Sequence, residues 1–292
     1  MGRSKQRRHD LPMSIHQHRQ TLKSLAESGV FLGTSSWKYP GWLGQLYDEQ
    51  RYLYRGKVAK SRFERDCLEE YAEVFSTVCV DAGYYRFPSE TYLEGLASQV
   101  PDGFKFSFKV TEEITVRRFP RIKKHGDRGG EMNDNFLNSQ LFKDAFLKPL
   151  HHAMPEKTGL LIFEFSRFKS GDFARGREFV ERLDQFFSEL PRDFDYGVEI
   201  RNASLLEPSY FEVLERHGVG HVYNHWQRMP GADEQLKMRS PDLNRSPAGA
   251  RLLLKPGRAY SEAVDGFSPY DELKEPQAPA RRAAVDLIRA AL

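Results

Sequence analysis

The sequence predicts an α/β fold, a TIM-type (β/α) barrel, and three observations lead to this prediction. The chain has 292 residues, a length typical of one such barrel. Short apolar runs that fit buried strands alternate seven times with segments of helical periodicity. No change in composition marks a second domain. Residues 29–292 are therefore expected to form a single TIM-like barrel domain, preceded by a basic tail and a short helix at residues 1–28.

The predicted strands are apolar runs bounded by turn-forming residues. Runs of this kind suit parallel strands that are covered on both faces. The first ends in the Gly/Ser-rich turn 33–36, and the third follows the turn Pro101-Asp102-Gly103. We expect strands at residues 30–34, 77–81, 104–110, 159–165, 196–200, 219–224 and 251–255.

The predicted helices carry apolar residues at three- and four-residue steps. In 61–75 these positions include Phe63, Cys67 and Tyr71, and Gly29 and Gly218 give stop signals after two other helices. We expect helices at residues 14–28, 61–75, 89–99, 136–154, 175–190, 210–217 and 280–292. The long polar connections 126–135 and 229–249 are expected to be lids or disordered loops.

Composition excludes several classes of protein. No run approaches the roughly 18 apolar residues that span a bilayer, and the basic start lacks the apolar stretch of a secretory signal. The two cysteines, Cys67 and Cys79, favour a reducing compartment. A net charge of +3, from 44 basic and 41 acidic residues, does not by itself indicate a nucleic-acid partner. The prediction is a cytoplasmic protein without a membrane partner.

Charged residues gather where the predicted strands end. Carboxyl ends of parallel barrel strands meet on one face, which is where barrel enzymes carry their sites. Glu199 and Arg201 are two apart on one strand and therefore point to the same side. Two interpretations are open: an ion pair that ties strands together, or a clamp that a substrate completes. The other polar strand-end residues are Asp81, Lys109, Glu164, Asn224 and Lys255. A doubly wound open sheet is the structural alternative, but these comparable polar ends fit one ring-shaped face better.

The sequence indicates no metal and no cofactor. His221 and His225 are four apart at the end of a predicted strand, where an extended backbone separates them by about 13 Å. The phosphate-loop and dinucleotide fingerprints are absent, as is a G-x-S-x-G elbow.

Six ordered segments resemble the domain of unknown function 72 (DUF72, YecE-like) family. The stretch 33–42, Gly-Thr-Ser-Ser-Trp-Lys-Tyr-Pro-Gly-Trp, is similar to the family's opening signature. The other similar segments are 71–88, 104–115, 159–165, 198–202 and 217–224. The resemblance implies a TIM barrel with a polar, ligand-binding mouth, and it implies no particular reaction.

The chain departs from the family pattern at four places. Cys79 and Asp81 stand where the family has a Glu-x-Asn pair, and Glu164 stands where it has Gln. Residues 254–257, Leu-Lys-Pro-Gly, replace an Arg-x-His-Gly motif, and no eighth strand with an Asn-Asn motif follows. We therefore expect a barrel with seven evident strands. The missing strand would leave an edge that residues 1–28 or a second subunit of an oligomer could cover.

Two functions are expected. The first is an enzyme acting on a small polar or phosphorylated substrate, with Glu199 and Asp81 as acid/base groups. In that enzyme Arg201, Lys109 and Lys255 would hold an anionic group, Trp37 and Tyr85 would shape the pocket, and Asn224 and Glu164 would line it. For Trp37, a hydrophobic cap over the barrel mouth is the alternative. The second function is a non-catalytic module that binds nucleic acid or a phosphorylated metabolite through the basic run 117–128.

Overall fold

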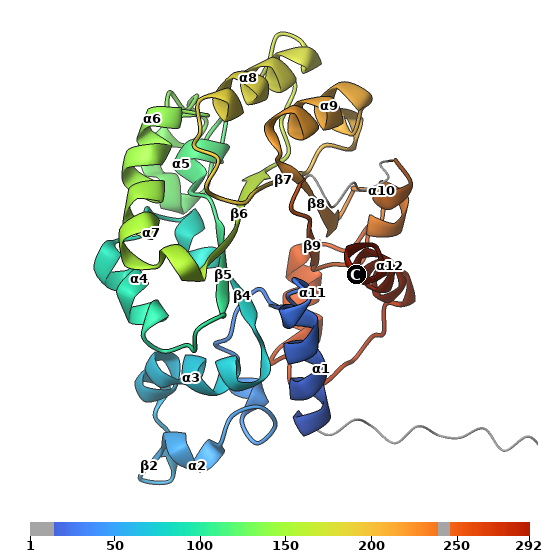
Figure 1. Cartoon of the computed structure of the whole chain (residues 1–292). Helices are drawn as coiled ribbons and strands as arrows, with labels where there is room; N and C mark the ends of the chain where they lie inside the picture. Colours follow the sequence, from blue (N-terminus) through green and yellow to red (C-terminus); the bar gives the residue numbers. More distant parts are fainter. Residues whose placement is uncertain (1–14, 239–245) are drawn as a thin grey trace, which may run out of the picture.

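Seven parallel strands form a curled half-barrel, which Figure 1 shows with its surrounding helices. This computed structural model describes residues 15–238 and 246–292. In spatial order the strands are β1 (Gly33–Thr34), β4 (Thr77–Val80), β5 (Lys105–Lys109), β6 (Thr158–Phe165), β7 (Tyr196–Ile200), β8 (Gly220–His225) and β9 (Gly249–Leu252). Within the described residues β9 does not pair with β1. The TIM-like fold with seven strands and no closing eighth is thereby confirmed.

The main helices alternate with the strands and lie outside the curl (Figure 1). The expected helix 136–154 is divided by a π turn at Lys143–Leu147, which separates α6 (Ser139–Phe142) from α7 (Lys148–Ala153). The other expected helices are α1 (Ile15–Glu27), α3 (Lys60–Val74), α4 (Glu90–Ala97), α8 (Gly176–Ser188), α9 (Pro208–His217) and α12 (Ala278–Ala291).

Several short elements have no counterpart in the sequence prediction. They are α2 (Glu49–Tyr52), the hairpin strands β2 (Leu53–Tyr54) and β3 (Lys57–Val58), α5 (Glu112–Thr115), α10 (Ala232–Met238) and α11 (Tyr260–Phe267). Most of them are a turn or less of regular structure, too short for hydrophobic periodicity to register.

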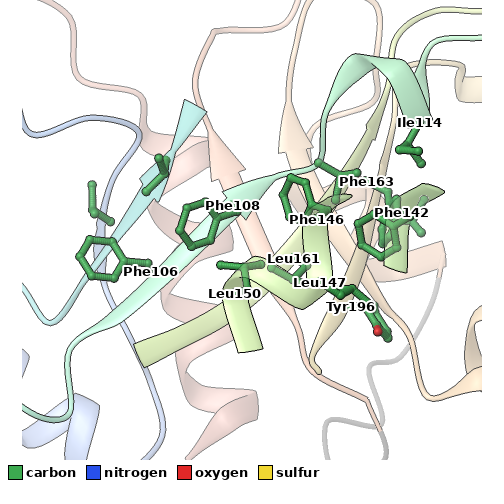
Figure 2. Packing of buried hydrophobic residues seen from close by; sticks show 14 of the residues in the cluster. Phe106, Phe108, Ile114, Phe142, Phe146, Leu147, Leu150, Leu161, Phe163 and Tyr196 are labelled. Carbon is green, nitrogen blue, oxygen red and sulfur yellow. The ribbon is translucent and has the colours of Figure 1, made fainter. Parts of the chain in front are cut away.

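The hydrophobic core lies between the outer face of the sheet and the helices. Phe106 and Phe108 alternate on β5, and Phe163 of β6 packs against Phe142 of α6 with ring centroids 5.1 Å apart. Figure 2 shows this packing around Phe146 of the π turn. Because neighbouring residues of a strand point to opposite sides, the residues between these phenylalanines face the inside of the curl. The inner face is thus left for polar side chains.

The open side of the half-barrel is bridged by the loop between α11 and α12. The indole nitrogen of Trp42 donates to the carbonyl oxygen of Tyr270 at 2.8 Å, and Gln45 donates to that of Asp271 at 2.8 Å. The backbones meet closely, since a Cβ on Gly41 would lie 2.5 Å from the carbonyl oxygen of Pro269. The chain after β1 is thereby linked to the chain after β9.

Residues 1–28 or a second subunit are also expected to cover the open edge, and this stays a prediction beside the observed contacts of the loop 268–271. Helix α1 packs on α3, where Arg19 pairs with Glu73 at 2.7 Å. Residues 1–14 lie outside the described part of the chain.

The polar connection 126–135 is ordered, contrary to the disordered loop that its composition suggests. The amide of Phe119 donates to the carbonyl oxygen of Glu131 at 3.0 Å, which folds the segment back on itself. The side-chain amide of Asn133 donates to the carbonyl oxygens of Glu113 and Val116, each at 2.8 Å. Of the second connection, 229–249, α10 is a helix, and residues 239–245 lie outside the described residues.

Candidate functional site

Six charged side chains meet inside the curl at the carboxyl ends of five strands. The strands place them there because each occupies an inward position of the two-residue alternation. They are Asp81 directly after β4, Lys109 on β5, Glu164 on β6, Glu199 on β7, Arg201 directly after β7, and Arg251 on β9. We call these residues the charge cluster.

Two carboxylates lie side by side at the centre of the cluster. Glu164 and Glu199 are partners in the register of β6 and β7. Such like charges would repel each other without cations between them. Arg201 Nη2 lies 3.0 Å from Glu164 Oε2 and 2.6 Å from Glu199 Oε1. Lys109 Nζ lies 2.8 Å from Glu164 Oε2.

Arg251 connects strands that are far apart in the sheet. Its Nη1 lies 2.9 Å from Glu164 Oε2 and 2.8 Å from Glu199 Oε2. Its Nη2 lies 3.4 Å from Asp81 Oδ1. Since β9 and β4 are separated by four strands in the sheet order, Arg251 reaches across the interior of the curl.

The cluster is mostly buried and is electrically balanced, with three carboxylates and three cations. Glu199 has no exposed surface, and Glu164, Arg201 and Arg251 are also buried. Burial alone would raise the pKa of Glu164, but Arg201, Lys109 and Arg251 together outweigh it and lower this pKa to about 2. Burial would lower the pKa of Arg251, yet Glu199 and the other acidic neighbours raise it. Glu164 and Arg251 therefore stay ionised at neutral pH.

Asp81 is the accessible carboxylate of the cluster. Its side chain is 43% exposed, against 11% for Glu164 and 0% for Glu199. Cys79 on β4 precedes Asp81 by two residues, and its Sγ lies 3.8 Å from Asp81 Oδ1. Burial raises the pKa of the Cys79 thiol to about 12, so this cysteine is not a thiolate at neutral pH.

A pocket of about 370 Å³ opens beside the cluster. Most of its lining residues belong to the segments that follow β6 and β8. Arg201 also lines it, and comes from the end of β7, which lies between β6 and β8 in the sheet. The guanidinium of Arg201 lies 3.9 Å from the ring centroid of Trp226. The lining residues are Glu164, Ser166, Arg167, Arg201, Trp226, Gln227 and Arg228.

Several buried polar atoms at this end of the sheet have no hydrogen-bond partner within the described residues. Nε of Arg201, Nε of Arg251 and Oδ1 of Asn224 belong to this group. Asn224 has no exposed surface, and its side-chain amide donates to the carbonyl oxygen of Ile200 at 3.2 Å. Unsatisfied polar atoms at a strand end are where water or ligand atoms bind.

Three residues in the predicted site do not join the cluster. Lys255 lies beyond β9 and pairs with Glu275 at 3.3 Å. Trp37 is buried in the main hydrophobic core, as the hydrophobic-cap alternative also requires. Tyr85 is exposed, with Lys124 Nζ 4.1 Å from its ring centroid. Its neighbour Tyr84, not Tyr85, lies under Lys109, at 4.3 Å.

The basic run 117–128 is partly neutralised by its own neighbours. Arg118 pairs with Asp172 at 2.9 Å, and Arg128 pairs with Glu113 at 2.8 Å. Lys124 pairs with Glu112. Half of the six cations that define the run are thus engaged within the fold, which reduces the positive charge it offers to a polyanion.

The described residues contain no group of three or more His, Cys, Asp or Glu side chains that could hold a metal ion. No helix among them is long and apolar enough to cross a membrane.

The family profile described as protein of unknown function DUF72 matches residues 31–275. The chain belongs to the DUF72 family. A solved DUF72 protein from Thermotoga maritima is similar to it, with 20% identity and a TM-score of 0.54 over 89% of this chain and 88% of that one. A DUF72 protein from Enterococcus faecalis has 16% identity and a TM-score of 0.46 over 75% and 92%. No curated protein matches. These likenesses to other DUF72 structures concern the fold alone.

Sequence reasoning misses three arginines of this DUF72 site. Arg251 is overlooked because the predicted strand 251–255 places it at the amino end, whereas β9 spans Gly249–Leu252 and so places Arg251 next to the carboxyl end. Gly249 breaks the apolar pattern since a Cβ there would lie 2.6 Å from Leu160. Arg167 and Arg228 lie in loops, where no periodicity marks them.

Proposed function

We propose that this DUF72 protein is an enzyme that acts on a small polar or phosphorylated molecule at the carboxyl-terminal face of its half-barrel. One observation carries the proposal: a buried, balanced cluster of six charges adjoins a pocket and leaves a single carboxylate, Asp81, substantially exposed. Preorganised charges in a water-poor mouth are the means by which enzymes stabilise charge that develops in a reaction.

Asp81 is the residue to which we assign proton transfer. A general acid or base must reach the substrate, and the exposure of Asp81 allows this. Arg251 contacts both Asp81 and the buried carboxylates, and so orients Asp81 relative to the cluster.

Glu199 has a different part in this proposal. It has no exposed surface and its close contacts are Arg201 and Arg251. We therefore assign it the positioning of these two arginines in place of direct contact with substrate. Lys109 likewise positions Glu164. The sequence predicts Asp81 and Glu199 as a pair of acid/base groups; in this proposal Asp81 keeps that role and Glu199 positions the arginines.

The test is a substrate screen with the full chain and a matched variant. Pools of small polar and phosphorylated metabolites are incubated with the wild type and with Asp81→Asn, and consumption is followed by mass spectrometry. Loss of a general acid/base should lower turnover about 100-fold or more. The unfolding temperature should change little, because the ion pair of the 43% exposed Asp81 contributes about 1 kcal/mol or less. Equal turnover by both proteins would contradict the role of Asp81. Binding without turnover in either protein would favour a non-catalytic module.

The nucleic-acid alternative has its own test. Binding through phosphates requires that affinity fall steeply as salt rises, and each phosphate contact adds roughly 0.7 to 0.9 to the log–log slope. With three of its six cations paired, the run 117–128 should give a shallow slope or none. Tight, steeply salt-dependent binding of an oligonucleotide, lost on substitution of Arg121 and Lys123, would replace our proposal.

A further inference from the structure

The pocket walls carry two arginines with no ion-pair partner among the described residues. Arg167 follows β6 and Arg228 follows β8, and both are exposed and line the pocket. Most other arginines near the mouth are engaged: Arg118, Arg201, Arg251 and Arg258 all pair with carboxylates. Unpaired cations that line one pocket are available to a ligand.

Arg201 lies between these two arginines. It is buried, it lines the same pocket, and its Nε has no hydrogen-bond partner among the described residues. Because β6, β7 and β8 are adjacent in the sheet, the three arginines come from three consecutive strand ends. Guanidinium groups bind phosphate oxygens through paired N–H donors, which suits a tetrahedral anion held from several sides.

Charge balance favours a dianion. The charge cluster cancels internally, whereas Arg167 and Arg228 add two positive charges at the pocket that nothing described neutralises. A phosphate monoester carries nearly two negative charges at neutral pH. A volume of about 370 Å³ is near the lower end for ligand pockets, which suits one small molecule and excludes a polymer from the interior.

Glu164, which lines the pocket, offers an acceptor for hydroxyl groups. The ion pairs of Glu164 with Lys109, Arg201 and Arg251 all end on Oε2, so Oε1 takes part in none of them. Glu164 stays ionised and can only accept hydrogen bonds. A ligand with hydroxyl groups can donate to that oxygen.

We propose that Arg167 and Arg228, with Arg201 between them, form a subsite for the phosphate of a small phosphorylated polyol or sugar, whose hydroxyls face Glu164. This inference rests on the proposed function and names the substrate class of the same site.

The experiment measures the binding of inorganic phosphate, ribose 5-phosphate and ribose to the full chain by calorimetry, at constant ionic strength and neutral pH. The variants are Arg167→Gln and Arg228→Gln. Lys169→Gln is the matched control, because Lys169 is exposed on the same loop and does not line the pocket. Wild type should bind ribose 5-phosphate more tightly than phosphate, and ribose most weakly. Each arginine variant should lose about tenfold in affinity or more for both phosphate probes, and the control less than about twofold.

Other results overturn the subsite in distinguishable ways. Equal affinity of all four proteins for the phosphate probes refutes the subsite, and so does absence of binding of both probes to the wild type. Ribose bound as tightly as ribose 5-phosphate refutes it as well. In each case, turnover of an uncharged polar substrate that depends on Asp81 would leave the proposed function standing. Conversely, arginine-dependent phosphate binding without any Asp81-dependent turnover would keep the subsite and reject the enzyme.

Discussion

Replacing Arg251 by Met should destabilise this protein more than the loss of any exposed ion pair. Arg251 is the cation that joins β9, at the open edge of the sheet, to the carboxylates of β4, β6 and β7. Met has a similar length and no charge, so the substitution removes the charge without leaving a large cavity. After it, Glu199 keeps only Arg201 as a close cation, and Asp81 keeps none in the cluster.

The magnitude follows from the three contacts of 2.8, 2.9 and 3.4 Å. At an effective dielectric constant of about 20, each of the two contacts with buried carboxylates contributes roughly 6 kcal/mol of attraction. The contact with Asp81 contributes less, because this side chain is 43% exposed and water screens it. Most of this sum offsets the desolvation of buried charges, so the net cost of removing one partner of a buried network is about 3 to 5 kcal/mol. For a chain of this size, each kcal/mol lowers the unfolding temperature by roughly 2 °C or somewhat more.

Urea unfolding of the full chain, followed by circular dichroism, gives the free energy directly. Arg177→Met is the control, because the Arg177–Glu181 pair is exposed and should contribute less than about 1 kcal/mol. The double variant Arg251→Met/Glu199→Met removes a cation and a carboxylate together, and it should be more stable than the sum of the single variants implies. A cost below about 1 kcal/mol for Arg251→Met, or strict additivity in the double variant, would refute the buried network as a stabilising unit.

Three further outcomes are expected. Folding lowers the pKa of Glu164 from 4.5 to about 2, so the ionised side chain stabilises the fold fully above pH 4.5 and this stabilisation is lost as pH falls towards 2. The free energy of unfolding, measured against pH, should therefore fall less steeply in acid for Glu164→Gln than for the wild type. Parallel curves would contradict this. Lys255→Gln should leave ligand binding unchanged, because Lys255 pairs with Glu275, whereas Lys109→Gln should weaken it; calorimetry of both variants decides, and the reverse order would return Lys255 to the site. Trp42→Phe removes the 2.8 Å hydrogen bond to Tyr270 and should cost about 1 kcal/mol while speeding proteolysis in the bridging loop; an unchanged cleavage rate would argue against the bridge.

The fold could be predicted because its signals are local. Helix α3 shows its apolar stripe through Phe63, Cys67 and Tyr71, all of them buried, and β6 is an apolar run that ends at Phe165. Alternation of such segments is enough to indicate parallel strands with crossover helices. The same signals cannot show what bridges the open edge, because the contact between Trp42 and Tyr270 joins residues 228 apart.

The site could be predicted only in part, and the reason is again distance along the chain. The two-residue spacing of Glu199 and Arg201 on a strand predicts that both side chains point to the same side. Glu164 and Lys109 are predicted from their positions at strand ends. Arg251 lies 170 residues from Asp81, and only the curl of the sheet brings them together. By position Lys255 is the more obvious cation in the sequence, yet it lies three residues beyond the end of β9 and pairs with Glu275.

The arrangement separates residues that maintain the fold from residues with which function can be mapped. Glu199 and Arg251 are buried, and their ion pairs inside the curl join residues of β6, β7 and β9 to one another and to Asp81 after β4. A variant of either residue therefore loses stability as well as activity, and the two effects cannot be separated. Asp81 is the exposed member of the cluster, and Arg167 and Arg228 are exposed and line the pocket, so substitution at these positions changes charge and little of the packing. Substitutions at these three positions therefore report on chemistry and ligand charge, and the buried residues serve as the stability reference against which to interpret them.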